Sequence, residues 1–149
     1  MAELWRLYSD LIRLEIELWD AVDRRLRAEC GVSMATFDVL QAVARTPSCR
    51  VYELARELSI TVGGTSKAVD RIEALGHLAR RSNPGDRRSS IIELTESGTD
   101  LLDRARAAAD RELELRLGSV LPADELDRLG DTITRLRTAG NHAGARNEE

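Results

Sequence analysis

One segment, residues 83–98, constrains the fold of this chain more than any other. It opens with the turn signal Asn-Pro-Gly, which carries Asp86, Arg87 and Arg88 to the tip of a loop. The residues Ser90–Leu94 that follow favour a short strand. A basic loop held between two short strands suits a protein that reaches into a DNA groove, whereas neither a core element nor a catalytic centre requires it. The segment therefore predicts a DNA-reading wing.

The hydrophobic pattern predicts helices on both sides of this hairpin. Apolar side chains from Leu4 to Leu26 recur at intervals of three, four or seven residues, which indicates an amphipathic helix that ends at Gly31. Further helices are expected from Ser33 to Thr46, over 51–58, from Thr61 to Gly76, from Ser97 through Leu113 and from Pro122 through Leu136. Ser33 and Thr61 are the residues expected to cap their helices. With strands expected over 78–81 and 90–94, the predicted fold is mainly α with a small β-hairpin (α+β).

The terminal helices decide the predicted domain organisation. They are too long, and too apolar on one face, to sit alone beside a small central module, and a second copy of the chain is the simplest partner. We expect residues 1–32 and 97–139 to form dimerisation helices, 33–96 to form a winged helix-turn-helix domain and 140–149 to form a disordered polar tail. The expected assembly is a symmetric homodimer.

The charge distribution indicates a nucleic-acid partner, although the whole chain has a net charge of −4. The segment from Cys49 to Leu94 holds eight basic and six acidic side chains, so it is net positive while the remainder is net negative. We therefore expect double-stranded DNA to bind to the central module.

Within that module, residues 51–58 would support a reading helix over 61–75, whose N-terminal residues would meet the bases. The apolar residues expected to pin these two helices together are Leu54, Leu58, Ile60, Val69 and Ile72. In the wing, Arg88 would enter the minor groove, where a guanidinium gains from the concentrated negative potential, and Asp86 would brace an arginine. The residues expected at the DNA interface are Thr61, the outward-facing Thr65, Ser66 and Lys67, then Arg71, Asp86, Arg87 and Arg88.

The chain resembles the MarR family, the dimeric winged-helix regulators of bacteria, in an ordered set of short motifs. These are LAREL at 54–58, VDRIE at 69–73, Gly76 before the first strand, the wing Asp86-Arg87-Arg88 and LTESG at 94–98. The resemblance implies a homodimer that represses transcription from inverted repeats and releases DNA in response to a small phenolic or oxidant signal. Asp86 and Arg88 match the family's Asp-any-Arg wing motif, which makes Arg88 the candidate for the minor groove.

The resemblance also implies an effector pocket where the dimerisation helices meet the winged module. By position, the residues that would line it are Trp5, Tyr8, Ile12, Met34, Phe37 and Asp38, and a small phenolic or other aromatic anion would be the ligand. Phe37 and Asp38, together with Arg71, resemble the urate-responsive branch, in which an acid and a reading-helix arginine link the ligand to DNA binding. A structural Asp38–Arg71 ion pair, with Phe37 in the core, is the alternative.

Gly63-Gly64 departs from the family, whose members commonly carry Ser, Thr or Arg early in the reading helix. A glycine inside a helix costs about 1 kcal/mol relative to alanine. Three interpretations are open: the backbone approaches DNA closely, the helix start becomes ordered only on binding, or the first turn is loosely wound without a special role.

Other chemistries have little support. Cys30 and Cys49 lack the flanking motif of an oxidant sensor, and a disulfide is disfavoured in a cytosolic protein. His77 and His142 are too few and too isolated for a metal site. No phosphate loop, nucleophile elbow or paired-acid motif is present, so we expect neither an enzyme nor a cofactor. No signal peptide or membrane span is evident, and the expected location is the cytoplasm.

The sequence thus predicts a ligand-responsive transcriptional repressor. Two other functions stay open: a constitutive architectural DNA-binding protein without an effector, and a ligand-binding dimer that has lost DNA recognition. An oxidant-sensing repressor that uses a cysteine is a further variant.

Overall fold

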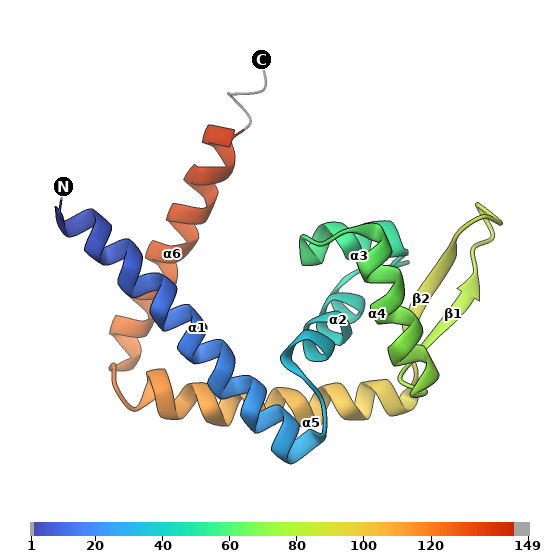
Figure 1. Ribbon diagram of the computed structural model, residues 1–149, viewed down its shortest axis with the longest axis horizontal. Coiled ribbons are helices and arrows are strands. Elements are labelled where there is room, and N and C mark those ends of the chain that lie inside the picture. Colours follow the sequence, from blue (N-terminus) through green and yellow to red (C-terminus); the bar gives the residue numbers. More distant parts are fainter. Residues whose placement is uncertain (1, 145–149) are drawn as a thin grey trace. The chain divides into compact units, whose positions relative to one another are not determined.

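The computed structural model describes the backbone of residues 2–144 and the side chains of residues 3–140 (Figure 1). The helices are α1 (Ala2–Cys30), α2 (Met34–Arg45), α3 (Val51–Leu58), α4 (Val62–Ala74), α5 (Glu96–Leu113) and α6 (Ala123–Gly144). The strands are β1 (Leu78–Ser82) and β2 (Ser90–Leu94), and a π-helical turn, η1, spans Glu114–Gly118. The chain divides into two compact units, one up to Asp110 and one from Arg111, which are described separately.

The helix boundaries follow the capping residues that the sequence predicted. The side chains of Ser33 and Thr61 cap α2 and α4 by accepting backbone N–H hydrogen bonds of 3.1 and 3.0 Å. Gly31 and Gly76 have φ angles of +69° and +86°, the left-handed conformation in which helices commonly end at glycine. These four predictions are confirmed.

Two features at the C-terminal side differ from prediction. The π-helical turn η1, in which the N–H of Ser119 donates to the carbonyl of Glu114 (2.8 Å), was not expected. The last helix continues to Gly144, so the prediction of a disordered tail is wrong for residues 140–144. A polar sequence can continue a helix that has already been nucleated, because each added residue forms another backbone hydrogen bond. Residues 145–149 lie outside the described part of the chain.

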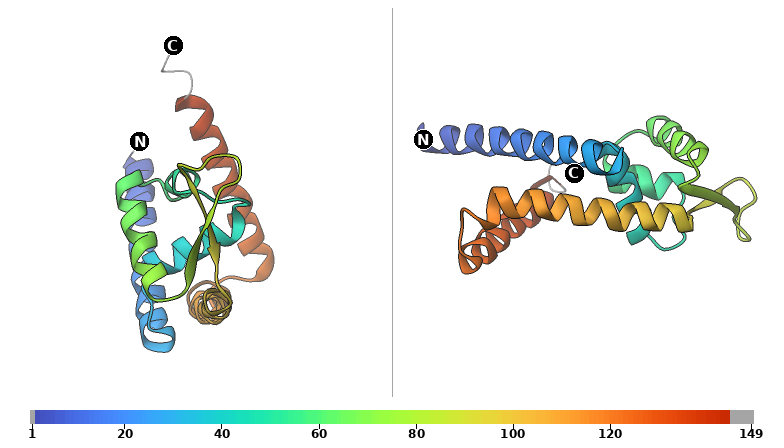
Figure 2. Two further views of the ribbon diagram at one scale, coloured as in Figure 1. Left: turned by 90° about the vertical axis from the view of Figure 1, so that its right-hand side faces the viewer. Right: turned by 90° about the horizontal axis from the view of Figure 1, so that it is seen from below.

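The wing hairpin is attached to the helices by backbone contacts, and Figure 2 shows it projecting beyond the module formed by α2, α3 and α4. Strands β1 and β2 pair in antiparallel register. The N–H of Ile92 donates to the carbonyl of Cys49 (2.6 Å), which fastens the segment before α3 to the free edge of β2. A Cβ at Gly98 would lie 2.0 Å from the carbonyl oxygen of His77, so α5 can begin against β1 only with glycine there.

The core of the first unit is aliphatic and joins the helix-turn-helix to the hairpin. Its fully buried large aliphatic side chains are Leu26, Leu40, Leu54, Val69, Ile72, Leu78, Ile92 and Leu102. Of the residues predicted to pin the two helices together, Leu54, Val69 and Ile72 are buried and Leu58 is half-buried. The prediction for Ile60 is wrong: this side chain is 48% exposed, because Ser59 turns the chain outward in a left-handed conformation.

Apolar side chains remain exposed on α1 and on α6. On α1 they are Leu4, Trp5, Leu7, Tyr8, Leu11, Ile12, Leu14, Ile16 and Trp19, and on α6 they are Leu129, Ile133 and Leu136. Contiguous apolar surface of this kind marks interaction sites in proteins. Within the described residues, no helix is both long and apolar enough to cross a membrane. The two faces are those that the sequence predicted to need a partner.

Candidate nucleic-acid interface

Helix α4 has one face in the core and the opposite face in solvent. Thr65, Val69 and Ile72, spaced by four and three residues, are each 0% exposed. Gly63 and Lys67, one turn apart, lie on the opposite side and are exposed. This outward face includes the helix N-terminus, which is the end that meets base edges in helix-turn-helix proteins.

The prediction that Thr65 faces outward is wrong. Its side chain lies on the buried stripe of α4, and its hydroxyl donates to the carbonyl of Thr61 (2.8 Å). The buried hydroxyl is satisfied within the first turn, so it costs little to bury. Thr61 is engaged in the same turn as the N-cap. Both threonines therefore order the helix start, while Ser66 (half-buried) and Lys67 (exposed) remain on the outward side.

Two short polar side chains order the wing tip. The Oδ1 atom of Asn83 accepts from the N–H of Gly85 (3.0 Å), and the Oδ1 atom of Asp86 accepts from the N–H of Arg88 (2.9 Å). Asp86 therefore braces an arginine, as predicted, by accepting from the backbone N–H of Arg88, and its negative charge also raises the pKa of Arg50. No ion pair joins Asp86 to an arginine within the described residues.

Ion pairs divide the cations of this surface into two groups. The guanidinium of Arg80 on β1 lies 2.7 Å from a carboxylate oxygen of Asp70 and 3.2 Å from one of Glu73, which clamps the wing to α4. Arg81 pairs with Glu93 across the hairpin at 2.7 Å. On α4 and the wing, four exposed cations form no ion pair with the described side chains: Lys67, Arg71, Arg87 and Arg88. Their charge is available to an anionic partner.

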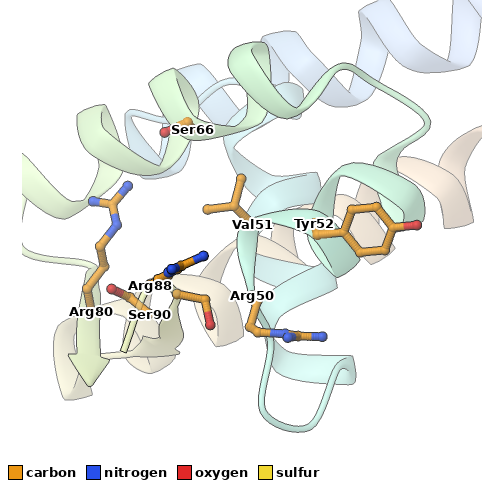
Figure 3. Close-up of a pocket in the computed structure, with 8 residues that line it drawn as sticks. Arg50, Val51, Tyr52, Ser66, Arg80, Arg88 and Ser90 are labelled. Atoms are coloured by element: carbon orange, nitrogen blue, oxygen red, sulfur yellow. The ribbon is translucent and has the colours of Figure 1, made fainter. Parts of the chain in front are cut away.

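A hollow of about 510 Å³ lies between α3, α4 and the hairpin (Figure 3). Its lining residues are Arg50, Val51, Tyr52, Ser66, Arg80, Arg88, Ser89 and Ser90. Hydroxyl and guanidinium groups of this kind are the usual donors to DNA phosphate oxygens. The guanidinium of Arg50 is already paired with the carboxylate of Glu53, and the hydrogen bonds between them raise the pKa of Arg50. The sequence did not predict a role for Arg50, because this residue precedes α3 and belongs to no motif. Its position in the net-positive segment from Cys49 to Leu94 was the only indication of such a role.

The predicted effector residues lie on α1 and α2 and differ in how exposed they are. The rings of Trp5 and Tyr8 lie against each other with centroids 5.4 Å apart, and both are exposed on α1, as is Ile12. Phe37 is buried in the core, and among the described side chains no ring contact joins it to that pair. Met34 is half-buried at the start of α2.

Asp38, the remaining predicted effector residue, lies half-buried on α2. Burial raises the pKa of its carboxyl, an effect that the positive charge of Arg45 partly offsets. Asp38 and Arg71 do not form an ion pair with each other in the part of the chain that the structure describes. The Asp38–Arg71 ion pair that both interpretations expected is therefore not made among the described residues, whereas Phe37 lies in the core as the structural alternative expected.

Cys49 and His77 have local structural partners. Cys49 is buried, and this burial, together with the negative charges of Glu53 and Glu57, raises the pKa of its thiol to about 11. Such a thiol is protonated at neutral pH and is a poor nucleophile. The Nδ1 atom of His77 lies 2.8 Å from the hydroxyl of Ser97. The described residues contain no group of three or more potential metal ligands, and the side chain of His142 lies outside that part of the chain.

The chain is similar to known proteins at three levels: a family model, a related sequence and solved structures. A model of the MarR family matches residues 31–89. The multiple antibiotic resistance protein MarR of Escherichia coli (strain K12) is 28% identical over 98 residues, which are 66% of this chain and 68% of that protein.

Two solved structures with DNA have the same fold over nearly the whole chain. Sco3205 of Streptomyces coelicolor, a MarR family transcriptional regulator in complex with DNA, has a TM-score of 0.82 and 27% identity over 94% of this chain and 88% of that one. CouR of Rhodococcus jostii RHA1, a transcriptional repressor bound to a 23-mer DNA duplex, has a TM-score of 0.81 and 28% identity over 92% and 96%.

Proposed function

We propose that the chain is a transcriptional regulator of the MarR family, and that it acts as a homodimeric repressor that a small aromatic anion releases from DNA. The proposed operator is pseudo-palindromic, because the two-fold symmetry of a dimer is mirrored in its binding site. The reading helices of the two protomers would then enter the major groove about 10 base pairs apart.

The observation that carries the proposal is the set of exposed cations without an ion pair on α4 and the wing. Lys67 and Arg71 extend from the reading helix, and Arg87 and Arg88 from the wing tip. The nearby Arg80 is neutralised by its two carboxylate partners. The proposed DNA contacts are therefore Ser66, Lys67, Arg71, Arg87 and Arg88, with Asp86 and Thr61 ordering the segments that carry them.

The exposed apolar faces of α1 and α6 support the homodimer. Trp5 and Leu4 are 70% and 68% exposed, and Leu136 is 65% exposed. Apolar surface removed from water contributes roughly 25 cal/mol per Å², so a partner that covers these faces gains a large driving force. In the proposal residues 1–32 and 97–139 form the dimer interface, and residues 33–96 bind DNA.

The regulatory part of the proposal has two supports. CouR, which shares the fold over nearly the whole chain, is named a transcriptional repressor, and another structure of CouR contains p-coumaroyl-CoA. In this chain the adjacent rings of Trp5 and Tyr8 offer an aromatic ligand a stacking surface on a helix assigned to dimerisation. A ligand that favours a dimer with misplaced reading helices would lower DNA affinity by a population shift. A cysteine-based oxidant switch is disfavoured at Cys49, whose thiol is buried and protonated.

Fluorescence anisotropy of the purified protein on DNA upstream of its own gene, against scrambled DNA and over a salt series, tests the proposal. Tight, sequence-dependent binding with a steep salt slope supports a regulator, since each phosphate contact contributes about −0.9 to the slope of log K against log salt. Equal, weak binding to both duplexes supports the architectural alternative, once other promoter fragments have been tested in the same way. Release of the protein from the operator by phenols or urate, but not by peroxide, supports an aromatic effector.

A further inference from the structure

Gly63 lies in the first turn of α4, and nothing inside the protein requires a glycine at this position. Gly31 and Gly76 are the glycines with a positive φ angle in the described chain, and Gly63 is not among them. The backbone of Gly63 therefore lies outside the left-handed region that only glycine adopts readily. A Cβ built at Gly63 would meet no atom within 4 Å. Neither the backbone conformation nor an internal contact therefore demands glycine, and alanine would be the better helix former.

Gly64 differs from its neighbour in this respect. A Cβ at Gly64 would lie 3.1 Å from the Oγ1 atom of Thr61, the atom that caps the helix. A side chain there would press on the cap, so Gly64 has an internal reason to be glycine. Of the two glycines, only Gly63 is without one.

The first turn of α4 is regular and is held by hydrogen bonds within the protein. Thr61 caps it through the N–H of Gly64 (3.0 Å), and Thr65 anchors it to the core and donates to the Thr61 carbonyl (2.8 Å). This geometry does not fit a loosely wound turn or a helix start that becomes ordered only on binding. Of the three interpretations of Gly63, close approach of the backbone to an external partner remains.

The direction of that approach follows from the position of Gly63 on the helix. It lies one turn before Lys67 on the outward face, opposite the buried stripe that contains Thr65. Ser66, three residues after Gly63, lines the hollow between α4 and the wing. An external partner that covers Lys67 and Ser66 therefore also covers Gly63.

We propose that Gly63 is a DNA-contact position, at which the missing side chain lets the backbone of α4 lie against the major groove. The closer approach brings the shorter side chain of Ser66, as well as Lys67, within reach of base edges and phosphates. This inference rests on the proposed function, because it assumes that α4 is the reading helix. It assigns the glycine to binding, although the same residue lowers the intrinsic stability of the helix.

The proposal predicts that a side chain at position 63 leaves the protein at least as stable but weakens its binding to DNA, and the test measures both quantities. In the full-length protein, Gly63→Ala should raise the melting temperature by about 2 °C, because alanine forms helices more readily than glycine. The same variant should bind operator DNA about tenfold more weakly, since a disturbed contact recurs in both half-sites. Gly63→Leu should lose more affinity without a fall in melting temperature.

Gly140→Ala is the matched control, because Gly140 also lies in a helix, α6, and its Cβ would also meet no atom within 4 Å. It should leave operator affinity unchanged. The inference is overturned if Gly63→Ala retains wild-type affinity, or if it lowers the melting temperature and thereby reveals an internal role. If Arg88→Ala weakens operator binding while Gly63→Ala does not, only this inference fails. If the wild-type protein shows no sequence-dependent binding, the proposed function itself fails.

Discussion

Replacement of Arg88 by alanine should weaken operator binding without changing the fold. The side chain of Arg88 is exposed and forms no ion pair within the described residues. The contact that orders the loop is made by its backbone N–H, which donates to Asp86 (2.9 Å) and is retained in the alanine variant. The free energy of unfolding should therefore change by less than about 0.5 kcal/mol, as for other surface substitutions.

The expected loss of affinity can be worked out from one contact in each protomer. A hydrogen bond to a charged group contributes about 1.5–3 kcal/mol, so two contacts at the lower limit amount to about 3 kcal/mol, or roughly a hundredfold in the dissociation constant. Partial compensation by water or by Arg87 would still leave a loss of at least about tenfold. If Arg88 displaces one counterion in each half-site, the slope of log K against log salt should also become shallower by about 1.8.

Fluorescence anisotropy over a salt series measures both quantities, and sedimentation of the same sample reports the oligomeric state. Arg81→Ala is the matched control, because Arg81 lies in the same hairpin but is paired with Glu93 at 2.7 Å. Loss of an exposed ion pair costs at most about 1 kcal/mol of stability, and DNA affinity should change far less than in Arg88→Ala. Unchanged affinity and slope in Arg88→Ala, or an equal loss in Arg81→Ala, would refute the assignment of the wing tip.

Three further predictions concern the assembly and two titrating groups. Leu129→Asp combined with Ile133→Asp places two charges on the exposed apolar face of α6 and should yield a monomer in sedimentation; a dimer would exclude this face as an interface. The hydrogen bond from the start of α2 lowers the pKa of Asp23, so its stabilising contribution is present above pH 3.8 and is lost as the pH falls through the lower folded-state value. Urea unfolding from pH 7 to pH 2 should show that loss in the wild type and not in Asp23→Asn. The raised pKa of Cys49 predicts the opposite sign at high pH: the unfolding free energy should fall as the pH rises from 9.0 towards about 11, and iodoacetamide at pH 8 should modify Cys30 before Cys49. Equal rates at the two cysteines, followed by mass spectrometry, would contradict the burial of Cys49.

The elements that the sequence predicted well are those whose determinants are local. Ser33 and Thr61 satisfy N–H groups within one turn of themselves, and Gly31 and Gly76 adopt a conformation that other residues avoid. The wing turn is local too, because Asn83 and Asp86 bond to backbone groups two residues away. Signals of this kind are present in the sequence before any tertiary contact forms.

The errors occur where the outcome depends on contacts distant in sequence. Thr65 has a polar side chain at a position that suits DNA contact, but the core fixes the rotation of α4 and buries it. Ile60 has an apolar side chain that predicts burial, but it lies in the turn between α3 and α4 and is 48% exposed. Hydrophobic periodicity predicts that a helix has two faces, but residues at the boundary of a face or in a turn depend on what packs against them.

By itself the sequence determined the order of the helices and strands, the wing and its basic tip, because these follow from capping, turn chemistry and hydrophobic spacing. Only the tertiary structure decided which cations are available for binding. It pairs Arg80 with Asp70 and Glu73, and leaves Lys67 and Arg88 without an ion pair. The structure also reduced three interpretations of Gly63 to one, since the space around a missing side chain is a property of the folded chain. Local chemistry is encoded residue by residue, whereas charge neutralisation and free space depend on residues that folding brings together.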